Sequence, residues 1–494
     1  MNPIRQLAGQ TAVYGLGIVV PRLLNYLLLT PFYTRIFDKG EYGIITEFYA
    51  YIVILMVFLT YGMETGFFRF ADREHNQKNV YRSALLALGF SSSIFIIFTF
   101  VCSQGLANSL DYPSNPEYIW WVGMIVGLDS FASIPFAKLR LENKAFKYAL
   151  IRILEITVNI GANWFFLFYC PDHSDTAWVL TVYDPEIGVG YVFISNLLSV
   201  VVKVLFLFKE IFFQPGIFDF PLIKKMLKYS FPLLVAGLAG TVNEVIDRVL
   251  LKYLIPDAQN PMEQLGIYGA SVKLAVLMTL FIQMFRYAAE PFFFSKKDES
   301  NAKDIYAEVM KYFVFFGMAI FLFVMLFMDI FILFIGPDFR EGASIIPVVL
   351  MANLFMGVFY NLSIWYKLSN KTIWGAYLVI IGAAVTFLIN FIFIPYYGYY
   401  ASSWGRFISY LLMILLSFTF GQKYYRINYQ VKKMLLFVVL ALLFYLASDL
   451  IMINSNFIKY SFYFLLMALF FAAFYFSERK GKLKTYSFRL SSKK

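Results

Sequence analysis

Long apolar stretches alternate with short polar gaps along almost all of the 494 residues. A helix needs about 20 apolar residues to cross a bilayer, and the chain has fourteen stretches that are long enough. This pattern predicts an all-α integral membrane protein with about fourteen transmembrane helices, and the even number places both termini on one side. The stretches cover residues 10–36, 42–67, 81–103, 117–137, 148–170, 187–208, 229–255, 265–291, 312–335, 343–366, 372–395, 399–420, 434–453 and 457–476.

The 42 Lys and Arg residues are divided unequally between the gaps. The gaps after even-numbered stretches and the two terminal segments hold most of them, whereas the other gaps hold only Lys39, Arg340 and Lys459. Loops that stay in the cytoplasm keep their Lys and Arg residues, and translocated loops lose them. We therefore expect both termini in the cytoplasm.

The composition agrees with a membrane protein, since the chain is 60% hydrophobic and only 15% charged. A net charge of +11 would suggest nucleic acid in a soluble protein. Here the basic residues lie in short loops on one side, where they favour anionic lipid head groups, and no nucleic-acid partner is expected. The two cysteines, Cys102 and Cys170, predict unpaired thiols rather than a disulfide framework.

The gaps are too short for a soluble catalytic domain, and no P-loop, HExxH, GxSxG or metal-ligand motif is present. The chain is therefore expected not to be an enzyme and to need no cofactor. A small active site within the membrane stays open, as does a purely structural scaffold, although a scaffold would not need charges at bilayer depth.

A short repeat predicts how the stretches are grouped. EYGIITEFYAY, which contains Gly43, resembles QLGIYGASVKL, which contains Gly266, and the downstream Phe67-Phe68 and Tyr81 correspond to Phe292-Phe293 and Tyr306. Six stretches separate the copies, so both have the same orientation, as in transporters that are built from parallel repeats. The expected organisation is an N-lobe at 1–210 with helices 1–6, a cytoplasmic linker at 211–228, a C-lobe at 229–422 with helices 7–12, two extra helices at 431–476 and a basic cytoplasmic tail at 477–494.

Charged residues inside the stretches are candidate functional residues, because a charge near the bilayer centre costs at least about 2.5 kcal/mol. Arg22 lies halfway along the first stretch and follows Pro21; it is expected either to bind an anion or to form a structural ion pair. Glu244 and Arg248 in stretch seven are four residues apart and can pair on one helix face, with Asp247 on the adjacent face. This group is either an internal ion pair or a site facing a cavity between the lobes.

Other candidates extend this set. Lys273 lies deep in stretch eight, whereas Arg286 and Glu290, again four residues apart, lie near its cytoplasmic end. Arg152 and Glu155 belong to a polar stripe on stretch five, which must face protein or water. Glu64 and Asp129 are either coupling sites for H⁺ or Na⁺ or partners of nearby Arg residues. Stretches thirteen and fourteen hold no charge in their interior. We expect them either to form a groove for a lipid tail or to have a purely structural role.

The opening QLAGQTAVYGLGIVVPRLLNYLLLTPFYTRIFDKGEYG resembles the lipid-linked oligosaccharide flippases of the MOP superfamily, in the polysaccharide-export or Wzx-type branch. The matching residues are Arg22, Pro31, Arg35 and the Glu41-Tyr42-Gly43 start of the second helix. DRVLLKYL from Asp247, LGIYGASVKL from Leu265 and FRYAAEPFFF from Phe285 extend the resemblance. The lipid II flippase branch carries a further Arg and Asp in the first helix, where this chain has the uncharged LLNYLLL.

The resemblance implies two six-helix lobes with two extra helices, alternating access and a bacterial inner-membrane location. It implies an isoprenoid-diphosphate-linked sugar as substrate, moved from the cytoplasmic to the periplasmic leaflet for surface polysaccharide or O-antigen synthesis, with polysaccharide polymerases or glycosyltransferases as partners. It also implies that Arg22 and Arg248, and then Lys273, Arg286 and Arg152, bind the diphosphate. A lipid II flippase and an ion-coupled multidrug antiporter of the same superfamily are the alternatives, and a membrane-embedded biosynthetic enzyme is the alternative from another class.

Overall fold

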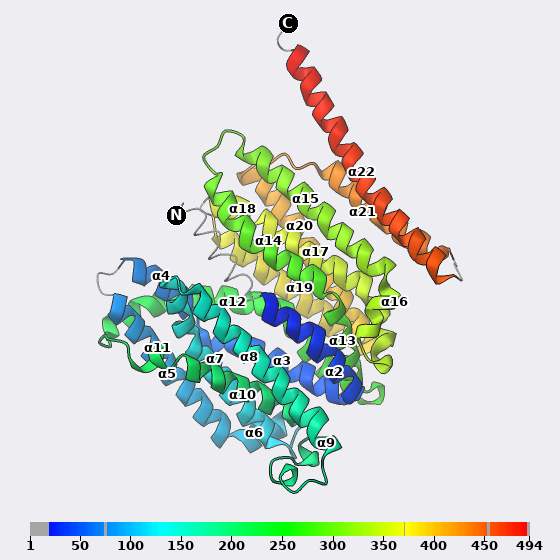
Figure 1. Ribbon diagram of the computed structural model, residues 1–494. Coiled ribbons are helices and arrows are strands. Elements are labelled where there is room, and N and C mark those ends of the chain that lie inside the picture. Colours follow the sequence, from blue (N-terminus) through cyan, green and yellow to red (C-terminus); the bar gives the residue numbers. More distant parts are fainter. Residues whose placement is uncertain (1–18, 74–76, 370, 452–454, 492–494) are drawn as a thin grey trace. The chain divides into compact units, whose positions relative to one another are not determined.

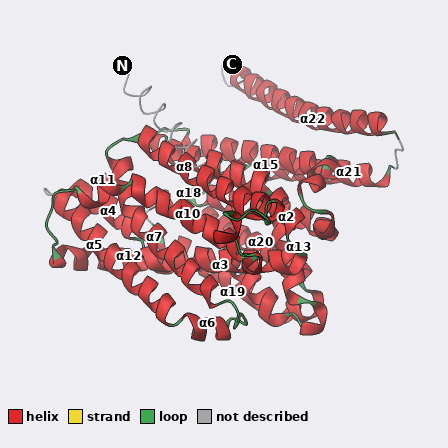
Figure 2. Ribbon diagram, turned by 60° about the horizontal axis from the view of Figure 1, so that its bottom comes forward, coloured by secondary structure: helices red, strands yellow, loops and turns green. Residues whose placement is uncertain are grey.

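The computed structural model describes residues 19–73, 77–369, 371–451 and 455–491, and its regular elements in these ranges are all helices (Figures 1 and 2). The expectation of an all-α membrane protein is thereby confirmed. Within these ranges, ten helices are long and apolar enough to cross a membrane, or eleven if the broken pair in stretch eight is one span. The full number of fourteen stays a prediction. Residues 10–18 of the first stretch lie outside the described residues, the helix of stretch six, Gly190–Phe206, is shorter than the ten, and the helix of stretch seven, Phe220–Leu254, is not among them.

Each predicted stretch that is described contains a helix. Residues 19–36 of the first stretch are helical and include a π-helical turn, η1, at Asn25–Leu29, followed by α2 at Thr30–Ile36. The other helices are α3 (Lys39–Thr60), α4 (Met63–Arg73), α5 (Gln77–Val101), α6 (Ser103–Ser109), α7 (Pro116–Leu141), α8 (Ala145–Trp164), α9 (Cys170–Asp172), α10 (Gly190–Phe206), α11 (Phe208–Phe212), α12 (Phe220–Leu254), α13 (Pro261–Leu274), α14 (Val276–Ser295), α15 (Ala302–Leu326), α16 (Met328–Phe331), α17 (Ile346–Leu362), α18 (Ile364–Leu368), α19 (Ile373–Tyr397), α20 (Tyr399–Tyr424), α21 (Val431–Leu450) and α22 (Asn456–Ser491).

Local sequence explains where α3 begins and ends. The Asp38 carboxylate accepts a hydrogen bond from the Glu41 backbone N–H at 2.8 Å, and the Glu41 carboxylate accepts one from the Asp38 N–H at 3.0 Å. This reciprocal arrangement is a capping box, which satisfies backbone donors at a helix start. At the other end Tyr61 and Gly62 adopt positive φ angles of 36° and 68°. That turn divides the predicted stretch 42–67 into α3 and α4.

Two boundaries differ from the predicted stretches. Stretch eight is broken at Ala275, which separates α13 from α14. The helix predicted at 312–335 already ends at Leu326, and α22 runs through the predicted tail as far as Ser491. Apolar length alone does not reveal such ends, because they depend on local backbone turns.

Contacts divide the chain into two compact units. Unit 1 contains residues 1–273, 335–341 and 383–402, and unit 2 contains 274–334, 342–382 and 403–494. Each unit has apolar cores, for example around Phe67 and Ile134 in unit 1 and around Phe293 and Ile364 in unit 2. The lobes at 1–210 and 229–422 are defined by the repeat rather than by contacts, and their boundaries stay a prediction.

The repeat has a symmetric contact inside unit 1. A Cβ on Gly43 would lie 2.1 Å from the Met262 carbonyl oxygen, and a Cβ on Gly266 would lie 1.9 Å from the Lys39 carbonyl oxygen. Met262 follows Lys39 in the sequence at the same distance at which Gly266 follows Gly43, and this distance is the spacing of the repeat. Glycine is required at both positions because only a residue without a Cβ allows backbones to approach this closely.

The aromatic part of the repeat refines the sequence match. Phe67 packs edge-on against Tyr81 at 6.0 Å between ring centres, and Phe293 packs edge-on against Tyr306 at 5.2 Å. Phe67 therefore corresponds to Phe293, one position away from the match predicted with Phe292. With this alignment Glu64 corresponds to Glu290.

Ion pairs between residues of different gaps agree with the alternation of charge between odd-numbered and even-numbered gaps. Lys39 in the first gap pairs with Glu341 in the ninth at 2.6 Å, and Lys147 in the fourth gap pairs with Glu210 in the sixth at 2.7 Å. Odd gaps thus meet odd gaps and even gaps meet even gaps. This is the arrangement that a chain crossing the membrane at every stretch requires.

Candidate functional site

The first helix changes its winding next to its charged residue. The chain is helical from residue 19, and the wider π-helical turn begins at Asn25, three residues after Arg22. Single π-turns inside helices occur frequently at functional sites. Here the π-turn contains Tyr26, which becomes the centre of a group of charged residues.

Charged side chains from three helices gather around Tyr26. The Lys273 ammonium of α13 lies 4.8 Å from the centre of the Tyr26 ring, in the geometry of a cation–π contact. Arg22, together with Glu244 and Arg248 of α12, is close enough to act electrostatically on the Tyr26 phenol. Arg248 also acts on Lys273. We call these five residues the Tyr26 cluster, and all of them belong to unit 1.

The Tyr26 cluster carries an excess of positive charge. It has three cations and one carboxylate, and within the described part of the chain neither Arg248 nor Lys273 forms an ion pair. Arg22 and Glu244 are exposed, whereas Arg248 and Lys273 are half-buried. A guanidinium and an ammonium that are held together without carboxylate partners suit a group with several negative oxygen atoms.

The polar residues of α12 do not form the arrangement expected from the sequence. Arg248 does not pair with Glu244, although the two are four residues apart. Asp247, 1% exposed, accepts hydrogen bonds from the Tyr268 hydroxyl and, at 2.9 Å, from the backbone N–H of Arg248. The Asp247 carboxylate therefore holds α12 and α13 together. It does not pair with the Arg248 guanidinium, which has no carboxylate partner among the described residues.

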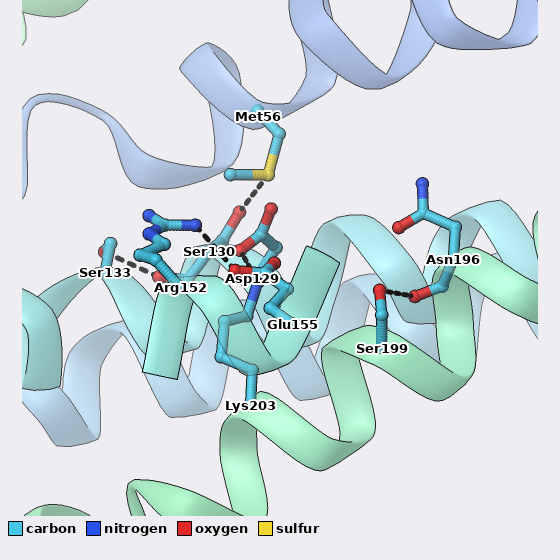
Figure 3. Close-up of polar contacts among 9 residues, drawn as sticks. All are labelled: Met56, Asp129, Ser130, Ser133, Arg152, Glu155, Asn196, Ser199 and Lys203. Carbon is cyan, nitrogen blue, oxygen red and sulfur yellow. Dashed lines mark hydrogen bonds and ion pairs between the residues drawn. The ribbon is translucent and has the colours of Figure 1, made fainter. Parts of the chain in front are cut away.

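A second charged group in unit 1 joins α7, α8 and α10 (Figure 3). Lys203, whose side chain is fully buried, pairs with Asp129 and, at 2.6 Å, with Glu155. Glu155 also pairs with Arg152 at 3.0 Å. We call these four residues the Lys203 network. Its two cations and two carboxylates balance, so it has no surplus charge for a substrate.

The remaining candidates belong to α4 and α14. Glu64 pairs with Arg140, and Glu290 pairs with Lys367 at 2.7 Å. Arg286 and Glu290 do not pair, although they are four residues apart. Instead, the Arg286 guanidinium lies over the Tyr360 ring, 4.8 Å from its centre. Within unit 1 the structure thus brings Arg22, Glu244, Arg248 and Lys273 together, whereas Asp129, Arg152 and Glu155 belong to the Lys203 network.

Sequence reasoning missed several buried charges of the described residues. Lys203 is one, and Arg406, 5% exposed, is another. Two more are Glu47, 0% exposed, and Lys252, which pair at 3.0 Å. The Glu47 carboxylate also accepts hydrogen bonds from the Tyr51 and Tyr112 hydroxyls. Lys252 stands one helical turn after Arg248, and this spacing could have drawn attention to it.

A comparison with known protein families finds one match. A profile of the family described as "Polysaccharide biosynthesis protein" matches residues 7–296. No curated protein matches the sequence significantly.

Solved structures share the fold. The structure described as lipid II flippase MurJ in an inward closed conformation has a TM-score of 0.75 and 13% identity, over 94% of this chain and 99% of that one. An inward-facing multidrug resistance MATE transporter of the MOP superfamily has a TM-score of 0.65 and 15% identity, over 81% and 94% of the two chains. An outward-facing multidrug resistance MATE transporter of the MOP superfamily has a TM-score of 0.62 and 15% identity, over 86% of this chain and 98% of that one. At such identities the likeness is one of fold.

Proposed function

Because this chain belongs to the polysaccharide biosynthesis protein family, we propose that it is a flippase for an isoprenoid-diphosphate-linked oligosaccharide. It moves this substrate from the cytoplasmic to the periplasmic leaflet of a bacterial inner membrane by alternating access. The product serves the synthesis of a surface polysaccharide such as O-antigen. Both termini are cytoplasmic in this proposal, and the energy comes from an H⁺ or Na⁺ gradient or from substrate mass action.

The surplus positive charge of the Tyr26 cluster carries the proposal. A diphosphate must be stabilised while it crosses a region of low dielectric constant, and each Arg of the cluster offers a planar fork of donors to phosphate oxygens. Arg22, Arg248 and Lys273 contribute three cations against the single carboxylate of Glu244. A cationic drug would be repelled by this group, so the cluster favours an anionic substrate over a multidrug-antiporter role.

Deletion and complementation test the proposal. We expect a strain without this chain to lose its surface polysaccharide and to accumulate a lipid-linked oligosaccharide on the cytoplasmic side, which lipid extraction and mass spectrometry would identify. Arg248→Met and Lys273→Met should reach wild-type abundance but fail to restore export. Full export with both substitutions combined would remove the cluster from the substrate path. Rescue of a strain depleted of its lipid II flippase would instead identify lipid II as the substrate.

The proposed orientation has its own test. In a variant with Cys102→Ser and Cys170→Ala, single cysteines replace Lys78, Asn115, Leu180, Ser300 and Asn428 in turn. An impermeant thiol reagent added to intact spheroplasts should label only positions 115 and 180, because these lie in odd gaps. Labelling at position 300 would contradict the orientation.

A further inference from the structure

A small pocket in unit 2 contains a buried amide that has no partner. The pocket lies between α14, α17 and α18, and Asn361 of α17 is among its lining residues. Asn361 is 2% exposed, yet neither its Nδ2 nor its Oδ1 has a hydrogen-bond partner among the described residues. Leaving a buried donor and acceptor unsatisfied destabilises a fold. Such a cost points to a group that binds there.

The surroundings of Asn361 are positively charged. Arg286 lines the pocket, lies over the Tyr360 ring and forms no ion pair within the described residues. Lys367 also lines it and pairs with Glu290. Two cations against one carboxylate leave a net positive pocket, and the guanidinium, the ammonium and the amide all supply N–H donors.

The first copy of the repeat provides an internal comparison. There, Glu64 and Arg140 form the ion pair that corresponds to Glu290 and Lys367. The position of Asn361 is then taken by Ile134, which is 0% exposed in an apolar core.

The cation of the pocket is also missing from the first copy. The position of Arg286 is taken there by Thr60, whose hydroxyl donates to the Met56 carbonyl of its own helix at 2.7 Å. In the first copy the fold therefore forms this region without an arginine or a buried amide at these two positions. The arginine and the unsatisfied amide are specific to the second copy.

We propose that this pocket, which we call the Asn361 pocket, binds the phosphate group of a lipid head group. Its volume of about 30 Å³ accepts one oxygen-sized group, and the other phosphate oxygens face Arg286 at the mouth. The same helix, α14, also exposes the large apolar side chains of Met284, Tyr287 and Phe292, which offer a surface for an acyl or prenyl tail. Arg286 and Lys367 lie at the ends of their stretches next to even gaps, which corresponds to the cytoplasmic leaflet.

The pocket is a second anion site, in the other unit from the Tyr26 cluster, and its test does not depend on transport. Native mass spectrometry of the full-length protein would measure binding of three probes: a long-chain polyprenyl diphosphate, phosphatidylglycerol and inorganic phosphate. We expect at least one of the two lipids to bind, and its binding to weaken at least about tenfold in Asn361→Leu and in Arg286→Gln, because each substitution removes a hydrogen bond to a charged group. A preference for the polyprenyl diphosphate makes the pocket a loading site for the proposed substrate, and equal binding makes it a general lipid site.

The same helix supplies a matched control. Asn353 of α17 is 5% exposed and donates to the Thr279 hydroxyl at 3.3 Å. Without added lipid, Asn361→Leu should raise the thermal midpoint, because an apolar side chain replaces an unsatisfied amide, whereas Asn353→Leu should lower it and leave lipid binding unchanged. Wild-type lipid binding in both Asn361→Leu and Arg286→Gln would show that the pocket holds only water. Equal competition by inorganic phosphate would show that the ligand is not a lipid. Either result overturns the proposal.

Discussion

The Lys203 network and the Tyr26 cluster both lie inside predicted membrane stretches of unit 1, and they differ in how their charges are matched. In the Lys203 network each cation contacts a carboxylate, and the four charges sum to zero. In the Tyr26 cluster two of the three cations, Arg248 and Lys273, contact no carboxylate among the described residues, and Lys273 lies over an aromatic ring instead. A charge at this depth is costly in both places, and in the first group every charge has an opposite charge as a direct partner. We therefore propose that the network stabilises the fold and that the cluster is available to a substrate.

The largest effect is expected when the network loses its central cation. Lys203→Met leaves Asp129 with no remaining ion pair and Glu155 with Arg152 alone. Breaking a buried ion pair costs about 3–5 kcal/mol, so we expect little folded protein in the membrane. Immunoblotting and fluorescence-detected gel filtration would measure this loss.

The control for Lys203→Met restores the charge balance. Adding Asp129→Asn removes the stranded carboxylate and leaves only the Glu155–Arg152 pair, so the double variant should recover most of the abundance. If Lys203→Met alone folds normally but cannot transport, the network is part of the transport mechanism and the contrast with the Tyr26 cluster fails.

Sequence reasoning could predict the helices but not the matching of charges. Stretch length and the Lys and Arg alternation identify membrane helices because the bilayer imposes both. The partners of a charge depend on the rotation of each helix about its axis, which packing determines. For this reason the spacing of Glu244 and Arg248 allows a pair that the structure does not form, and nothing in the sequence marks Lys203 as the centre of a network.

A smaller stability loss is expected at the second buried ion pair of unit 1. Lys252→Met leaves the Glu47 carboxylate buried, but the Tyr51 and Tyr112 hydroxyls still donate to it. We therefore expect a loss of about 1.5–3 kcal/mol, less than for Lys203→Met, measured as a fall in the thermal midpoint of the purified protein. Glu47→Gln combined with Lys252→Met should reverse part of this loss. A larger loss than for Lys203→Met would mean that the hydroxyls do not replace the lost cation.

The Tyr26 cluster should respond in transport and not in stability. Arg248→Lys keeps the positive charge but loses the planar fork that binds two phosphate oxygens. We expect an unchanged thermal midpoint and export reduced about tenfold, which corresponds to the loss of one charged hydrogen bond. Quantifying surface polysaccharide at matched protein abundance would measure the effect. A fall in the thermal midpoint with normal export would assign Arg248 to packing, like the residues of the network.

The smallest effect is expected at an ion pair on the surface of unit 2, where water competes with the partners. Burial raises the pKa of the Asp329 carboxyl, but the Lys459 ammonium at 2.8 Å and the Tyr460 hydroxyl at 2.9 Å lower it more, so its pKa lies below the ordinary value of 3.8. A lowered carboxyl pKa adds stability that is fully present above the unfolded value and is lost as the pH falls through the folded value. Because the pair is about a third exposed, Asp329→Asn should cost less than about 1 kcal/mol at pH 7. The difference in thermal midpoint between this variant and the wild type should shrink as the pH is lowered from 5 to 3. A difference that stays constant over this range would mean that the charge of Asp329 contributes nothing and that shape alone holds α16 against α22.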